Sequence, residues 1–116
     1  MRYHIITIFP EIFDSFLQTS LIAKAQEKKL ISFNLVNPRD FCTDKHKQID
    51  DEPYGGGAGM LMKTQPIIGA IKNITIKKDK TKVILLGPSD KIFDQRKAHR
   101  FVDDYTDIIL ICGRYE

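Results

Sequence analysis

The segment from Asp50 to Met60, DDEPYGGGAGM, carries residues whose types and spacing suit chemistry best. Its three consecutive glycines, 55–57, lose more backbone entropy on ordering than other residues, so a purely structural loop gains little from them. Their use is to let the backbone approach a ligand closely. The carboxylates of Asp50 and Asp51 can accept hydrogen bonds from the N–H groups of a base. The segment therefore predicts a ligand-binding loop, with a flexible surface loop as the alternative.

Two familiar phosphate-binding patterns do not fit this segment. A Walker loop requires Lys and then Ser or Thr after its last glycine, and Gly59 is followed by Met60 and Leu61. The dinucleotide fingerprint requires a further glycine at a fixed offset and a preceding strand, and neither is present. A metal site built from His46, Asp50 and Asp51 remains an alternative, but their spacing matches no established ligand pattern, so no metal is expected.

Two further candidate segments each follow an apolar run. Gly87-Pro88-Ser89-Asp90 follows Val83 to Leu86, and residues 113–116, GRYE, follow Ile108 to Cys112. In open α/β sheets, ligands bind beyond the carboxyl ends of the strands. The glycine at 113 permits a sharp turn and leaves space for a ligand. Both segments are therefore predicted to contact a ligand, with a solvated strand end as the alternative for residues 113–116.

The elements that must position these segments follow from hydrophobic periodicity. We expect buried strands over 3–9, 31–36, 83–86 and 107–112. Helices are expected from Pro10, from a cap at Ser20, from Thr64 and from a cap at Asp94, and residues 42–59 are expected to form a long loop. Apolar strands separated by helices predict an α/β fold with a parallel sheet and helices on both faces. At 116 residues the chain is expected to form a single domain.

Charge and composition narrow the class of protein. The chain has 18 Lys and Arg against 15 Asp and Glu. Nine of the basic residues, but only three acidic ones, fall within 72–100. This basic segment indicates either a solvated surface or an anionic partner such as nucleic acid. The longest apolar run, Ile108 to Cys112, is far shorter than the ~20 residues of a membrane helix. Two cysteines 70 positions apart indicate thiols in a reducing cytoplasm.

Taken together, the motifs resemble a known family, the bacterial tRNA (guanine-N1)-methyltransferases of the SPOUT superfamily. The resemblance covers all 116 residues, as the N-terminal portion of such an enzyme. The motifs that carry it are Phe9-Pro10-Glu11-Ile12-Phe13, Pro38-Arg39-Asp40-Phe41, Asp44-Lys45-His46-Lys47, the segment from Asp50 to Met62, and Cys112-Gly113-Arg114-Tyr115-Glu116.

The resemblance implies methyl transfer from S-adenosylmethionine to N1 of the guanosine directly 3′ of the tRNA anticodon. It also implies a SPOUT-type fold whose C-terminal trefoil knot is incomplete in this chain, and a cytoplasmic homodimer. The cofactor-binding residues that it implies are Leu86, Pro88, Gly113 and Tyr115. The RNA-binding residues that it implies are Asp50, Tyr54, Gly55, Gly56, Gly57, Gly59, Arg114 and Glu116.

The sequence departs from the family pattern at two places. Gly87-Pro88-Ser89-Asp90 stands where the family usually has Ser-Pro-Gln-Gly, and Ala58 stands where it usually has proline. The family's catalytic aspartate falls beyond Glu116, so we expect a truncated chain that is inactive alone and assign no catalytic residue within it. The alternative function is a non-catalytic RNA-binding module, which the basic segment and the glycine-rich loop would suit equally. A generic nucleotide-binding α/β protein is disfavoured because both phosphate-loop patterns fail.

Overall fold

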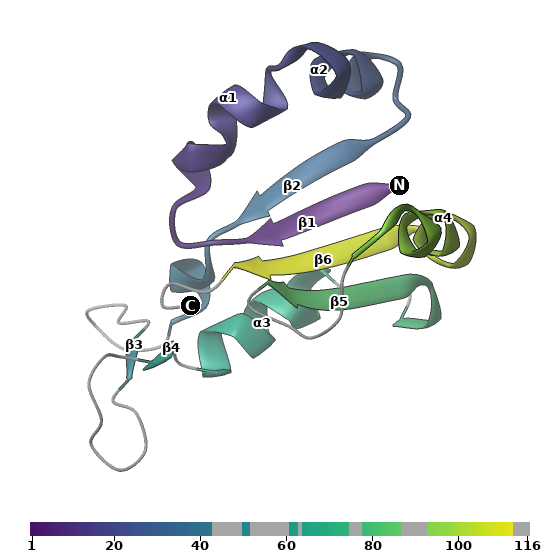
Figure 1. The fold of residues 1–116 in the computed structure, drawn as a ribbon. Coiled ribbons are helices and arrows are strands. Elements are labelled where there is room, and N and C mark those ends of the chain that lie inside the picture. Colours follow the sequence, from purple (N-terminus) through teal and green to yellow (C-terminus); the bar gives the residue numbers. More distant parts are fainter. Residues whose placement is uncertain (43–49, 52–60, 63, 75–77, 87–92, 113–116) are drawn as a thin grey trace.

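A parallel sheet organises the chain. The computed structural model describes residues 1–42, 50–51, 61–62, 64–74, 78–86 and 93–112. Within these residues, β1 (Arg2–Ile6), β2 (Ser32–Val36), β5 (Thr81–Leu86) and β6 (Asp107–Cys112) form a four-stranded sheet in the order β2-β1-β6-β5 (Figure 1). Every neighbouring pair is parallel, as the unbroken apolar runs predict.

The register of the strands assigns each side chain to one face of the sheet. Ile5 lies beside Leu35 and Leu110, while Ile6 lies beside Val36 and Ile111. Successive side chains along a strand point to opposite faces, so His4 shares a face with Ile6, and Tyr3 shares the other face with Ile5. Strand β6 is central, and four of its six residues are buried.

One face of the sheet packs against α3 (Thr64–Ile74). The buried core there joins two strands to the helix, through Ile6, Ile109, Ile111, Ala70 and Ile74. Ile67 and Ile71 of α3 pack against this core, whereas Ile68 is 44% exposed and lies outside it. The spacing of the apolar residues thus predicts the helix, and the packing selects which of them are buried.

The opposite face of the sheet carries the other helices. They are α1 (Asp14–Leu17), α2 (Ser20–Glu27) and α4 (Gln95–Asp104). Phe16 of α1 meets Phe33 of β2 edge-on at 6.2 Å between ring centroids, and Phe33 stacks on Tyr3 of β1 at 5.3 Å. A pocket between α4 and this face is lined by Tyr3, Leu110 and Phe101, among others. Helices on both faces of a parallel sheet confirm the predicted α/β class.

Short elements complete the described chain. Three 3-10 helices are η1 (Pro10–Phe13), η2 (Pro38–Phe41) and η4 (Lys78–Lys80). Within the expected 42–59 loop, β3 (Asp50–Asp51) instead pairs antiparallel with β4 (Leu61–Met62). No described helix has the length and apolar character needed to cross a bilayer.

Two expected helix caps have different outcomes. The Asp94 cap is confirmed, because its Oδ1 accepts a hydrogen bond from the Lys97 backbone N–H at 2.9 Å. The Ser20 cap is wrong: Ser20 is the first residue of α2, and Thr19 is the flanking residue. The Thr19 hydroxyl accepts no capping bond from α2, and it donates to the Ser15 carbonyl oxygen at 2.6 Å.

Candidate functional site

The candidate site lies at the carboxyl ends of the parallel strands. Leu86, the last residue of β5, is in register with Cys112, the last residue of β6. Two of the candidate segments therefore leave adjacent strands at the same level. Figure 1 shows the strand arrows pointing to one end of the sheet, with η2, β3 and β4 gathered at that end. This is the end where parallel α/β sheets bind ligands.

Helix η2 holds one of the family motifs at this end. The Asn37 side chain begins the turn by accepting a hydrogen bond from the Arg39 backbone N–H at 3.0 Å. Pro38 is buried, and Phe41 packs against the α3 core. Arg39 and Asp40 between them are exposed. The motif thus has two anchoring residues and presents one cation and one carboxylate to solvent at the candidate site.

The β3–β4 pair fixes the base of the glycine-rich segment. Asp50 pairs with Met62, and Asp51 pairs with Leu61. The residues that enter and leave the segment 52–60 are therefore adjacent. Periodicity alone missed this pair, because two-residue strands are too short to show alternation.

The structure describes two of the predicted site residues. Leu86 ends β5 with 40% of its surface exposed, and Asp50 is the first residue of β3. The other predicted cofactor-binding residues, Pro88, Gly113 and Tyr115, lie outside the described residues. So do the other predicted RNA-binding residues: Tyr54, Gly55, Gly56, Gly57, Gly59, Arg114 and Glu116.

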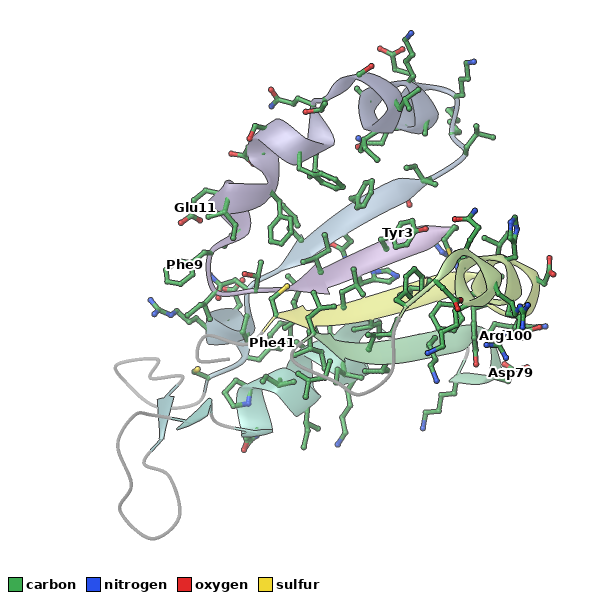
Figure 2. All side chains as sticks on the ribbon, in the orientation of Figure 1. Tyr3, Phe9, Glu11, Phe41, Asp79 and Arg100 are labelled. Carbon is green, nitrogen blue, oxygen red and sulfur yellow. The ribbon has the colours of Figure 1, made fainter. Side chains whose placement is uncertain are left out.

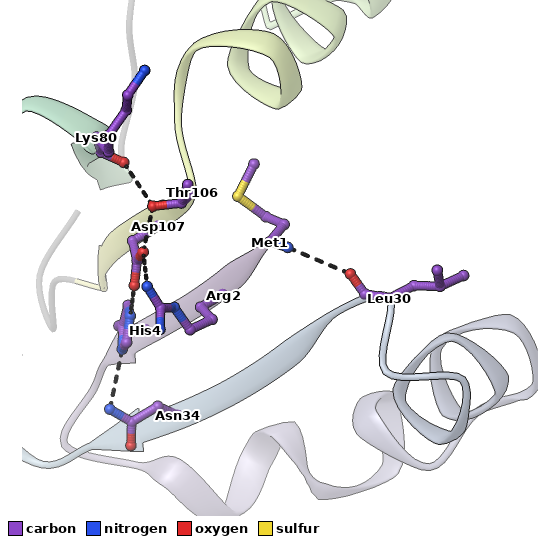
Figure 3. A network of polar contacts seen from close by, with 8 residues as sticks. All are labelled: Met1, Arg2, His4, Leu30, Asn34, Lys80, Thr106 and Asp107. Atoms are coloured by element: carbon purple, nitrogen blue, oxygen red, sulfur yellow. Dashed lines mark hydrogen bonds and ion pairs between the residues drawn. The ribbon is translucent and has the colours of Figure 1, made fainter. Parts of the chain in front are cut away.

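A buried polar network occupies the opposite, amino-terminal end of the sheet (Figure 3). His4 Nε2 lies 2.7 Å from Asp107 Oδ2, and its Nδ1 lies 3.1 Å from the Asn34 side-chain nitrogen. Asp107 Oδ1 accepts hydrogen bonds from Arg2 and from the Thr106 hydroxyl, both at 2.8 Å. Side chains from three neighbouring strands and the residue before β6 are thereby joined.

The charge of Asp107 is stabilised by these contacts. Burial raises the pKa of its carboxyl, but hydrogen bonds from Arg2, His4 and Thr106, together with the charge of Arg2, outweigh burial and lower the pKa to about 2. The network contains no nucleophilic thiol and lies away from the strand ends where the motifs gather. Its role is structural, since it ties together three neighbouring strands. Sequence reasoning missed Asp107 as the partner of His4, although a carboxylate opening an apolar strand is a signal worth testing.

The described residues contain no cluster of three potential metal ligands. Of the metal set considered from the sequence, His46 lies outside the described part of the chain. Among the described residues at the carboxyl end of the sheet, Arg39 and Asp40 are exposed on η2, and Leu86 is partly exposed at the end of β5.

Known proteins match this chain along its whole length. Residues 1–116 match the family described as tRNA (Guanine-1)-methyltransferase TrmD. The chain belongs to this family. Proteins named tRNA (guanine-N(1)-)-methyltransferase from Trichormus variabilis and Synechocystis are each 47% identical over 116 residues, and one from Clostridium botulinum is 49% identical.

These tRNA (guanine-N1)-methyltransferase relatives are longer than the chain. The 116 matched residues are 100% of this chain and 47%, 49% and 47% of the three relatives, so the chain spans about half of their length. Pro38–Phe41 forms η2, and Cys112 ends the central strand, so both lie at the carboxyl end of the sheet.

Proposed function

We propose that the protein methylates N1 of the guanosine directly 3′ of the tRNA anticodon, with S-adenosylmethionine as the methyl donor. The observation that carries the proposal is the family match over all 116 residues. The gathering of the family's motifs at the ligand-binding end of the parallel sheet supports it.

The donor fits what the described residues offer. Leu86 is partly exposed at the end of β5 and provides an apolar surface on which an adenine ring can pack. Leu86 and Cys112, the last residues of β5 and β6, are in register, and we propose that the segments 87–92 and 113–116 that follow them contact one ligand. We assign donor binding to Leu86, Pro88, Gly113 and Tyr115. When bound, the donor supplies a methyl group on a sulfonium that is already activated.

We assign RNA binding to a second set of residues at the carboxyl end of the sheet. Asp50, Tyr54, Arg114, Glu116 and the glycines at 55, 56, 57 and 59 are proposed to hold the RNA. Carboxylates there can accept hydrogen bonds from base N–H groups, and glycines let the RNA approach the backbone. Arg39, exposed on η2, adds a cation for a phosphate.

Methyl transfer to guanine N1 requires a proton acceptor and an alignment of the methyl group with N1. Guanine N1 carries a proton near neutral pH and is a poor nucleophile, so methyl transfer needs a base close to N1. The methyl group must also lie in line with N1, which requires both substrates to be held rigidly. We propose that Asp50 and Glu116 position the RNA and do not accept this proton. A homodimer with interfacial sites, a trefoil knot and a cytoplasmic location are parts of the same proposal.

The test is methyl transfer by the full-length protein. Purified protein is incubated with labelled S-adenosylmethionine and a tRNA transcript that has guanosine 3′ of its anticodon. Label should enter the tRNA, and nucleoside mass spectrometry should identify it as 1-methylguanosine. A matched transcript with adenosine at that one position is the control and should remain unlabelled.

Two outcomes would contradict the proposal. Equal labelling of both transcripts would place the methyl group elsewhere in the tRNA. Tight tRNA binding without transfer to either transcript would favour the non-catalytic RNA-binding module.

A further inference from the structure

The short helix η2 is anchored to the protein along one side only. A 3-10 helix has ~3 residues per turn, so side chains three positions apart lie on the same side. Pro38 and Phe41 are such a pair: Pro38 is fully buried, and Phe41 packs against the core between α3 and the sheet. Arg39 and Asp40 fall on the two remaining sides of the turn, and both are exposed. The motif therefore combines two anchoring residues with two charges that face away from the anchors.

The contacts of η2 hold it in one place. The Asn37 side-chain oxygen accepts a hydrogen bond from the Arg39 backbone N–H at 3.0 Å, which begins the turn at a defined residue. A Cβ built on Gly69 of α3 would lie 3.2 Å from Phe41 Cβ, so the missing side chain lets η2 lie close against the helix. The backbone of Arg39 is thus fixed beforehand, which lowers the entropy that is lost when its side chain binds a partner.

Helix η2 lies at the carboxyl end of the sheet, where the candidate site is. The Thr7 N–H donates to the Val36 carbonyl oxygen at 2.9 Å, so β1 and β2 end side by side, and η2 begins two residues after Val36. Figure 1 shows β3 and β4 gathered at the same end, and their pairing makes the two ends of the glycine-rich segment adjacent. Arg39 therefore shares this end with Asp50, which we assigned to the RNA.

The charge of Arg39 is not neutralised by any other side chain in the described part of the protein. Successive side chains of a 3-10 helix point about 120° apart, which directs the Asp40 carboxylate away from the Arg39 guanidinium. A guanidinium presents its N–H donors as a planar fork that matches two oxygens of one phosphate. An exposed arginine on an anchored turn, beside a predicted RNA-binding loop, therefore suits a backbone phosphate.

We propose that Arg39 binds one backbone phosphate of the tRNA anticodon loop, and that Phe41 and Gly69 are positioning residues that hold η2 where this contact is made. The inference rests on the proposed function for the identity of the polyanion. A phosphate contact fixes the RNA in place but carries no base information. Arg39 thus sets where the anticodon loop lies, and the recognition of the guanosine is left to other residues.

The experiment removes the charge of Arg39 from the full-length protein. In Arg39→Gln, the dissociation constant for tRNA should rise about tenfold at ~0.1 M salt, because one charge-assisted contact is lost. The slope of log affinity against log salt should shrink by ~0.7, the value for one phosphate of a single strand. The methylation rate at saturating tRNA should stay unchanged. Two transcripts that differ in anticodon-loop bases other than the target guanosine should lose affinity alike, and a loss confined to one of them would overturn the phosphate assignment.

Two variants serve as matched controls. Arg100→Gln makes the same substitution at an exposed position of α4, and Figure 2 shows Arg100 at the end of the molecule away from Phe41. It should keep the tRNA affinity and salt slope of the unmodified protein, and equal effects of the two Gln variants would overturn the proposal. Arg39→Lys keeps the charge but not the planar fork, so it should keep the salt slope and lose less affinity than Arg39→Gln. A slope reduced as much as in Arg39→Gln would contradict a charge contact.

A double-mutant cycle tests the positioning residues. Gly69→Val should displace η2 and weaken tRNA binding in the unmodified background, but it should cause no further loss once Arg39 is already Gln. Circular dichroism at the assay temperature checks that each variant is folded, and Gly69→Ala replaces Gly69→Val in the cycle if the larger residue prevents folding. Equal losses in both backgrounds would show that Gly69 does not act through Arg39.

Failure of this inference is distinguishable from failure of the proposed function. If the unmodified protein does not form 1-methylguanosine, the proposed function fails whatever the Arg39 variants show. If methylation occurs but Arg39→Gln binds tRNA like Arg100→Gln, then Arg39 does not hold the RNA backbone.

Discussion

His4 on β1 and Asp107 on β6 are 103 positions apart, yet their side chains meet at 2.7 Å inside the protein. With the Asn34 amide donating to Nδ1, His4 carries its proton on Nε2 and donates it to Asp107. The pair therefore joins β1 to β6 at the amino-terminal end of the sheet. Because the four strands are parallel, it also helps to set the level at which β6 ends beside the candidate site.

The Asp107 carboxyl should make stability depend on pH in acid. Its pKa is lowered from 3.8 to about 2, so the folded state favours the ionised form. The resulting stabilisation is fully present above the unfolded pKa near 3.8 and is lost as the pH falls through about 2. We expect ~1–2 kcal/mol of the free energy of unfolding to disappear over this window. Denaturant titrations of the full-length protein between pH 2 and 5 measure it, and Asp107→Asn should flatten the curve. A curve that Asp107→Asn leaves unchanged would assign the acid sensitivity to other carboxylates.

Removing the Asp107 side chain should cost more than its own hydrogen bonds. In Asp107→Ala, His4 stays buried without its acceptor, and Arg2 is left without its ion-pair partner. We expect a loss of ~2–4 kcal/mol in the free energy of unfolding at pH 7. Asp103→Ala on exposed α4 is the control and should change stability by about 0.5 kcal/mol or less. Similar losses in the two variants would mean that the network contributes little.

The contact between α3 and η2 should be sensitive to the size of residue 69. A Cβ built on Gly69 would lie 3.2 Å from Phe41 Cβ, closer than most such contacts. Gly69→Val adds further atoms toward Phe41, so we expect it to push η2 outward and to lower the free energy of unfolding by ~1–3 kcal/mol. Lys72→Val places the same side chain on an exposed position of α3 and should cost about 0.5 kcal/mol or less. Chemical denaturation compares the two, and equal losses would show that η2 does not depend on this contact.

Two adjacent leucines of β5 allow a test of donor binding with a matched control. Leu86 shares a sheet face with the α4 pocket, whereas Leu85 points to the face that α3 covers elsewhere and is 72% exposed. Leu86→Asp should weaken S-adenosylmethionine binding by the full-length protein about tenfold or more, since it removes an apolar surface from the donor site. Leu85→Asp should leave the affinity nearly unchanged. Isothermal titration calorimetry measures both, and equal affinities would remove Leu86 from the donor site.

The sequence by itself determined the local elements and the family. Apolar runs predicted the strands that became β2, β5 and β6, and the isoleucine spacing predicted α3, because burial of one face imposes a period on the chain. The Asp94 cap was also predictable, since its bond reaches only three residues along the chain. The motifs at Pro38–Phe41 and Cys112 indicated the family that the whole chain then matched.

Only the tertiary structure decided how distant segments meet. The insertion of β6 between β1 and β5 places His4 against Asp107, and no local pattern encodes a partner 103 positions away. From the sequence, Gly69 only lowers the helix propensity of its segment. The structure shows that Phe41 lies against it, so a larger residue there would be crowded. Thr19 and Ser20 are both good caps by type, and only the structure shows that Thr19 flanks α2 while its hydroxyl bonds to Ser15 in the preceding helix. Likewise, Lys82 and Arg100 line one groove between β5 and α4 only because the fold brings these two elements together. Lys72 is separated from them because α3 packs on the opposite face of the sheet.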